Sequence, residues 1–268
     1  MNSLPRSPDE PIHGMRRKIE LRRWARDTVV VWMEDDFHHF GVTLVHDGGQ
    51  VRDIRGEMVR YPWSTCPGAA HKLRELIGKP LVSRASDVGR LIEMRVHCTH
   101  FFDLAGLAMA HAAHGRDRRL YDVVVLDRDV IAATEKTGLP LKTGEGLAAL
   151  WCDGQQVLRW HLDDQTIITP EASAGQSLQR GFREHTEAME EEQAEYATIL
   201  RRAVMVASGR LVDLLQFETA IELDSPPVCY SYQPERARIA LHNHDSLRDY
   251  ARSPEGMLAF RQRKPAAG

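Results

Sequence analysis

The residues best suited to chemistry lie close together near the start of the chain. The string Asp35–Phe40 reads Asp-Asp-Phe-His-His-Phe, and Arg60 and Tyr61 follow on what the pattern predicts to be the next strand. Histidine titrates near neutral pH, and a neighbouring carboxylate can fix its tautomer and orientation. Together they suit the transfer of a proton to or from a substrate. The sequence therefore predicts a general acid–base site in this region.

Alternation along a strand decides which of these side chains can meet. Residues 28–45 and 51–61 are predicted as two strands joined by a tight turn at Asp47-Gly48-Gly49-Gln50, because glycine accepts positive φ at no steric cost. With Gly48-Gly49 as a two-residue loop, the paired residues would be Asp36 with Tyr61, His38 with Val59, Phe40 with Glu57, Phe37 with Arg60 and His39 with Met58. Asp36, His38 and Tyr61 would then share one face. A slip of one residue would regroup them, and a purely structural His–Asp pair is the alternative.

The leading functional hypothesis is a cofactor-independent acid–base lyase that acts on an aromatic small molecule. His38 would remove a proton with Asp36 orienting it, and His100 would serve as a second acid. Tyr61 or Arg60 would stabilise the developing oxyanion, although a salt bridge from Arg60 to Asp35 is an equal alternative. The expected reaction is C–C or C–O cleavage, for instance retro-aldol release of a small aldehyde. The predicted substrate-binding residues are Phe37, His39, Phe40, Trp63, Cys66 and Phe101.

Cys66 stands before Pro67, at the predicted start of a helix. A thiol in this position meets the positive end of the helix dipole, which lowers its pKa and favours an anion site. This arrangement motivates a further alternative, a non-enzymatic accessory module that binds a ligand of an aromatic or acyl-CoA pathway. The competing interpretation is a buried small residue, with Ser64 or Thr65 as the cap.

A metal site is another alternative. Cys98 and His100 begin the second predicted helix, and together with His38 and His39 they would offer a soft-ligand set for a divalent transition metal in a hydrolase or lyase. No regular metal-ligand spacing supports this set. The sequence also has no glycine-rich nucleotide loop and no serine-hydrolase elbow, which removes those common functional classes.

The pattern of elements predicts an α+β fold, an antiparallel sheet built from hairpins and packed by about three helices. The helices are expected near residues 67–77, 98–114 and 181–206. Strands are expected at 18–24, 28–45, 51–61, 91–96, 120–126, 148–152, 157–162 and 166–169. We expect residues 1–15 to be a disordered lead-in, 16–215 a single domain, and 216–268 an extended C-terminal arm that favours a homodimer.

Composition restricts the partners. The chain carries 35 Lys+Arg against 38 Asp+Glu, a net charge of −3, which gives no electrostatic case for nucleic acid. Its four cysteines are widely spaced, as in proteins of a reducing compartment. No apolar leader or membrane-length apolar run is present. We therefore expect a cytoplasmic protein that does not contact a membrane.

Several strings resemble a bacterial family that is catalogued as a domain of unknown function. They are Asp-Asp-Phe-His-His-Phe (35–40), the segment 60–69 with its Thr-Cys-Pro-Gly-Ala end, Leu76-Ile77-Gly78, and Cys98-Thr99-His100. The likeness covers about Arg17 to Leu215. The resemblance implies a link to the breakdown of aromatic compounds and acyl-CoA intermediates, and it assigns no catalytic residues.

Overall fold

The computed structural model describes residues 3–259 and divides them into two compact units. Among these residues, the first unit comprises 3–18, 121–216 and 249–255, and the second comprises 19–120, 217–248 and 256–259. Met1 and Asn2 of the predicted lead-in, and residues 260–268 of the predicted arm, lie outside the described residues. Among the described residues, no helix is both long enough and apolar enough to cross a bilayer.

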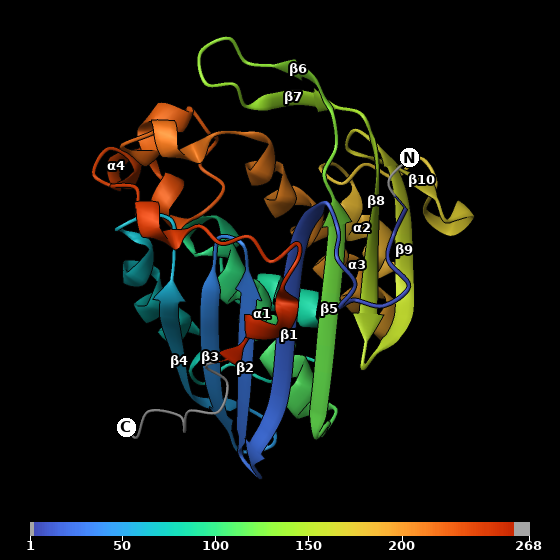
Figure 1. The fold of residues 1–268 in the computed structure, drawn as a ribbon. Coiled ribbons are helices and arrows are strands. Elements are labelled where there is room, and N and C mark those ends of the chain that lie inside the picture. The colour runs from blue at the N-terminus through green and yellow to red at the C-terminus, as the bar shows by residue number, and fades with distance from the viewer. Residues whose placement is uncertain (1–2, 260–268) are drawn as a thin grey trace. The chain divides into compact units, whose positions relative to one another are not determined.

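The second unit holds a sheet segment in the order β1-β2-β3-β4 and a helix packed on it (Figure 1). Its strands are β1 (Gly14–Ala25, in this unit from Ile19), β2 (Thr28–Asp35), β3 (His39–His46) and β4 (Val51–Arg60). Helix α1 (Thr99–Ala113) packs against β2 and β3. Short 3₁₀ stretches include Cys66–Leu76, Ala85–Arg90 and Met94–Val96, and a one-turn helix, α4, spans Pro234–Ala237.

The first unit also contains antiparallel strands, in the order β10-β9-β8-β5. These are β5 (Arg118–Leu126, in this unit from Tyr121), β8 (Glu145–Cys152), β9 (Gln155–Asp163) and β10 (Thr166–Thr169). A separate hairpin joins β6 (Val130–Ala133) to β7 (Pro140–Thr143). Helices α2 (Phe182–Glu187) and α3 (Glu191–Ala207) complete the unit, and α3 packs on β8 and β9.

The predicted α+β class with an antiparallel sheet built from hairpins is confirmed. Three predicted elements differ from the structure. The long strand at 28–45 is the two strands β2 and β3, the helix at 181–206 is broken between α2 and α3, and residues 94–96 of the strand predicted at 91–96 form a 3₁₀ turn.

The predicted register of the β3–β4 hairpin holds only beside its turn. His46 pairs with Val51 as expected, but a bulge follows and Phe40 faces Met58 instead of Glu57. A second irregularity places His39 opposite Arg60. Each bulge inserts one extra residue into a strand and shifts all later pairs. The predicted grouping of side chains across this hairpin is therefore wrong.

Candidate functional site

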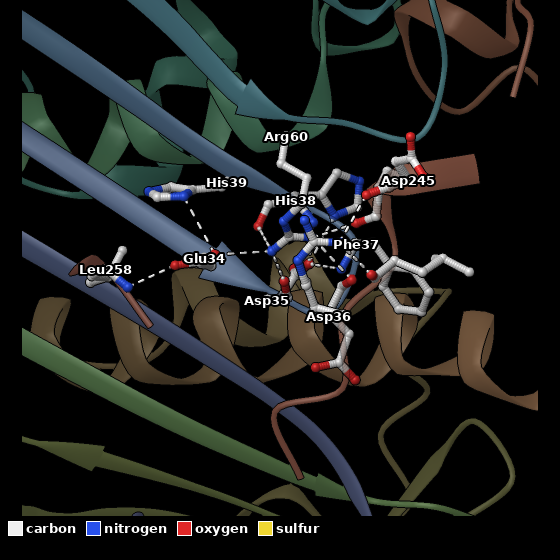
Figure 2. A network of polar contacts seen from close by, with 12 residues as sticks. Glu34, Asp35, Asp36, Phe37, His38, His39, Arg60, Asp245 and Leu258 are labelled. Atoms are coloured by element: carbon white, nitrogen blue, oxygen red, sulfur yellow. Dashed lines mark hydrogen bonds and ion pairs between the residues drawn. The ribbon is translucent and has the colours of Figure 1, made fainter. Parts of the chain in front are cut away.

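The second unit contains a polar cluster at the turn between β2 and β3 (Figure 2). The two strands pair regularly up to Glu34 opposite His39, and the Asp35 N–H donates to the His38 carbonyl at 2.9 Å. Asp36 and Phe37 thus form a two-residue hairpin loop. The N–H groups of Phe37 and His38 both donate to Asp35 Oδ1 at 2.8 Å. A carboxylate that accepts from the backbone two and three residues ahead is a common way to stabilise a turn.

The same carboxylate orients the imidazole of His38. Asp35 Oδ1 lies 3.0 Å from His38 Nδ1, and the side chains are 0% and 13% exposed respectively. An ionised carboxylate can only accept, so this contact places the proton of a neutral imidazole on Nδ1. Nε2 then carries a lone pair, and the His38 side chain is partly exposed to solvent.

A second imidazole comes from the first turn of α1. The ring centroids of His38 and His100 are 4.0 Å apart and their planes are inclined by 35°. Phe40 packs edge-on against both rings, with centroids at 5.3 Å from His38 and 5.6 Å from His100. Ligand-capable atoms of Asp35, His38 and His100 all lie within 4.8 Å of one another. The cluster therefore joins one carboxylate to two imidazoles against an aromatic wall.

Arg60, at the end of β4, stabilises this turn by hydrogen bonds. Its guanidinium donates to the carbonyls of Asp35 (2.5 Å), Asp36 (3.0 Å) and His38 (3.2 Å), and to that of Ser246 (2.8 Å). It also forms an ion pair with Glu34 at 3.1 Å, where both side chains are less than a tenth exposed. Sequence reasoning offered a salt bridge from Arg60 to Asp35 as an alternative and did not foresee this pair with Glu34. These five bonds give Arg60 a supporting place behind the turn and do not leave it aimed at a substrate.

Glu34 connects further groups on that side of the turn. One carboxylate oxygen lies 3.4 Å from His39 Nδ1, and the other accepts from the N–H of Leu258 at 2.7 Å. Burial lowers the pKa of His39 despite the opposing influence of the Glu34 charge. His39, predicted to bind substrate, packs its ring edge-on to Trp32 with centroids 5.5 Å apart, and so it belongs to the Glu34 network.

Two further predicted catalytic residues have other contacts. The main-chain carbonyl of Asp36 accepts from Arg60 and from the N–H of Arg248, and Asp35 has the role toward His38 that was predicted for Asp36. The carbonyl of Tyr61 accepts from Asn243 Nδ2 at 3.3 Å. The strand pairing of Asp36 with Tyr61, from which the Asp36–His38–Tyr61 grouping was predicted, is wrong because residues 36 and 37 form a turn, where strand alternation does not apply.

Some of the aromatic residues that were predicted to bind substrate lie near the imidazoles. The rings of Phe37 and His38 have centroids 6.1 Å apart, while Phe101 packs behind Phe40 at 5.4 Å. Trp63 lies in another cluster, with its ring 5.0 Å from that of His242 and its Nε1 donating to Tyr232 Oη at 3.2 Å.

Cys66 lies in this other cluster too, with its Sγ 3.3 Å from Ser231 Oγ. Burial raises its pKa to about 12, so the predicted lowering of the pKa is wrong: loss of water around a thiolate outweighs the helix end. Burial likewise raises the pKa of Cys98. Neither thiol belongs to the cluster of Asp35, His38 and His100.

Sequence reasoning missed Asp35 and Glu34 as site residues. The available signal was the spacing Asp-x-x-His, which fits a two-residue loop whose first flanking residue is a turn-capping aspartate. Interpreting residues 35–38 as a turn would have paired Asp35 with His38 directly.

Comparison with known proteins adds one match. Residues 20–114 match the model of a family described as "Protein of unknown function (DUF2889)". The matched range contains Asp35, His38, Arg60 and His100, and thus the whole of the cluster. A search of curated proteins found no match to this chain. The resemblance to a family of unknown function is confirmed over residues 20–114, whereas the likeness predicted for residues 115–215 and the link to catabolism stay predictions.

Proposed function

We propose that the protein is an acid–base enzyme whose active centre is Asp35, His38 and His100. The observation that carries this proposal is the bond from His38 to the buried carboxylate of Asp35, beside a second imidazole with its ring centroid 4.0 Å away. An imidazole oriented by a carboxylate is a recurrent general base in enzymes. The range that contains these residues is also the range that matches the family.

In this proposal His38 removes a proton from the substrate through Nε2. Asp35 holds the imidazole in the required tautomer and stabilises the charge that forms on it. His100 is close enough to return a proton to the leaving group. Arg60 supports the turn in this scheme, and we no longer assign it the oxyanion, because its bonds to Glu34 and to four carbonyls hold it behind the strand.

The substrate class that we propose is an aromatic small molecule, free or as an acyl-CoA ester, and the reaction is a lyase-type C–C or C–O cleavage. The aromatic residues Phe37 and Phe40 flank His38, and aromatic walls with few polar groups are typical of sites for such ligands. Proton abstraction next to an electron-withdrawing group is the chemistry that this centre can supply unaided.

The test is a comparison of turnover by matched variants. Wild type, His38→Gln and His100→Gln are incubated with a panel of aromatic acids and their CoA esters, and the products are followed by mass spectrometry. We expect His38→Gln to lose at least about 100-fold in rate, as is common when a general base is removed. His114→Gln is the control, because that exposed histidine caps the far end of the same helix and bonds the Ser83 carbonyl. A folded His38→Gln protein with unchanged turnover would refute the proposal.

A further inference from the structure

We infer that Asp35, His38 and His100 form a binding site for one divalent first-row transition-metal ion. This inference rests on the proposed function only for the identity of the active centre. With the ion bound, a metal-bound water would take the part in proton transfer that His38 has in the metal-free protein. The ligand set differs from the one predicted from sequence, because Asp35 replaces His39 and Cys98.

The spacing of the three side chains fits an ion. Their ligand-capable atoms lie within 4.8 Å of one another. An ion at the best point between three such atoms would lie within about 2.8 Å of each of them, and the usual ligand distances are about 2.0–2.2 Å for nitrogen and oxygen. Asp35 Oδ1 and His38 Nδ1 are 3.0 Å apart, somewhat closer than the separation of about 3.4 Å between neighbouring ligands of a tetrahedral ion.

The surroundings also resemble those of a metal centre. Ligating carboxylates in proteins are themselves held by hydrogen bonds, and apolar groups around a site control access of water. Asp35 accepts from the N–H groups of Phe37 and His38, and Phe40 packs against both imidazoles. Asp35 and His38 belong to the end of β2 and its turn, and His100 to the first turn of α1, so two different elements supply the ligands.

The chemistry of the set indicates the class of ion. Two imidazoles and one carboxylate give a single negative charge with nitrogen and oxygen donors, which favours Zn²⁺, Fe²⁺, Co²⁺ or Mn²⁺ over Ca²⁺ and Mg²⁺. The nearby positive charge of Arg60 is paired with Glu34. The thiols of Cys66 and Cys98 stand outside the cluster and burial raises their pKa, so a thiolate site is disfavoured.

The test uses Co²⁺ alone, because its visible absorption reports coordination. Full-length protein is treated with a chelator, dialysed, and titrated with Co²⁺ by absorption and by calorimetry. We expect one ion per chain, and a loss of at least about 10-fold in affinity for His38→Gln, His100→Gln and Asp35→Asn. Asn keeps an oxygen that can accept from the backbone, so this variant removes the ligand charge while preserving the turn. His39→Gln, next in sequence but in the Glu34 network, is the matched control and is expected to bind as wild type does.

Each outcome decides between the proposals. Absence of stoichiometric Co²⁺ binding, or equal binding by wild type and the Asp35 and His100 variants, would overturn the metal inference. Turnover by chelator-treated protein that depends on His38 would overturn a metal requirement and support metal-free acid–base catalysis. Stoichiometric binding that is lost in the three variants supports the site, and such binding without turnover of any tested substrate would count against the proposed enzyme only.

Discussion

Replacing Arg60 with Met is expected to destabilise the second unit strongly. The Arg60 side chain is 8% exposed, and its guanidinium makes four bonds to main-chain carbonyls and one to Glu34. Met has a similar length and fills much of the same space without any donor. The change therefore tests the polar role of Arg60 more than its packing.

The expected loss follows from the groups left behind. Breaking one side of a buried ion pair costs about 3–5 kcal/mol, because the remaining charge is uncompensated. Glu34 is 5% exposed, and it would retain only the Leu258 N–H and the His39 ring among the partners described above. A buried carbonyl that loses a donor adds about 1–3 kcal/mol, at the low end here because a carbonyl has two lone pairs. We therefore expect a total of at least about 4 kcal/mol, a large part of the 5–15 kcal/mol typical of a domain.

Urea unfolding followed by circular dichroism measures this loss. Arg55→Met is the matched control on the same strand, because Arg55 is exposed and bonds Asp53 at the surface, so its loss should stay below about 1 kcal/mol. In the double variant Glu34→Gln with Arg60→Met, the buried charge is gone and the loss should be smaller than the sum of the single losses. A loss below 1 kcal/mol for Arg60→Met, or strict additivity, would refute this account of the network.

Three further predictions concern other parts of the chain. Burial lowers the pKa of His111 from 6.5 to about 4, so the folded state favours the neutral imidazole. The free energy of unfolding should therefore decrease as the pH decreases from about 6.5 to about 4. The urea midpoint should decrease less steeply with pH in His111→Leu, and an equal pH dependence in both proteins would contradict this. Because burial raises the pKa of Cys66 to about 12, its thiol should react slowly with iodoacetamide at pH 8 until the protein is unfolded, as peptide mapping by mass spectrometry would show. A Cβ at Gly41 would lie 2.7 Å from the Trp32 ring, so Gly41→Ala should lower the free energy of unfolding by about 1–3 kcal/mol. Gly49→Ala is the control, because its Cβ would have Asp47 Oδ1 as its nearest neighbour at 3.7 Å. This variant should lose much less stability in the same urea assay.

Much of the fold could be predicted from sequence because its signals are local. Leu104, Leu107 and His111 recur at helical spacing and predicted the helix that is α1, and the paired glycines after Asp47 predicted the turn between β3 and β4. The break between β2 and β3 was missed because Asp36-Phe37 has no Gly or Pro. Its turn is stabilised by hydrogen bonds from the backbone to the Asp35 side chain, and β propensity takes no account of such bonds.

The site could be predicted only in part because its geometry depends on register. Two bulges in the β3–β4 pairing shifted Phe40 and His39 against β4, and nothing in the local sequence marks where an extra residue enters a strand. His38 and His100 were nevertheless both named as candidates, because an imidazole near a carboxylate on a predicted strand and another at a predicted helix start were chosen for their chemistry. Their contact, with ring centroids 4.0 Å apart, depends on how α1 packs on β2 and β3.

One oxygen atom links the turn to the chemistry. Asp35 Oδ1 accepts from two backbone N–H groups and also contacts the His38 imidazole. The group that sets the loop geometry therefore also sets the orientation of the proposed base. A variant such as Asp35→Ala would lose both at once, so its inactivity would say nothing about catalysis. Asp35→Asn retains an acceptor for the backbone while removing the charge beside His38, and for this reason only the amide variant can separate a structural aspartate from a functional one.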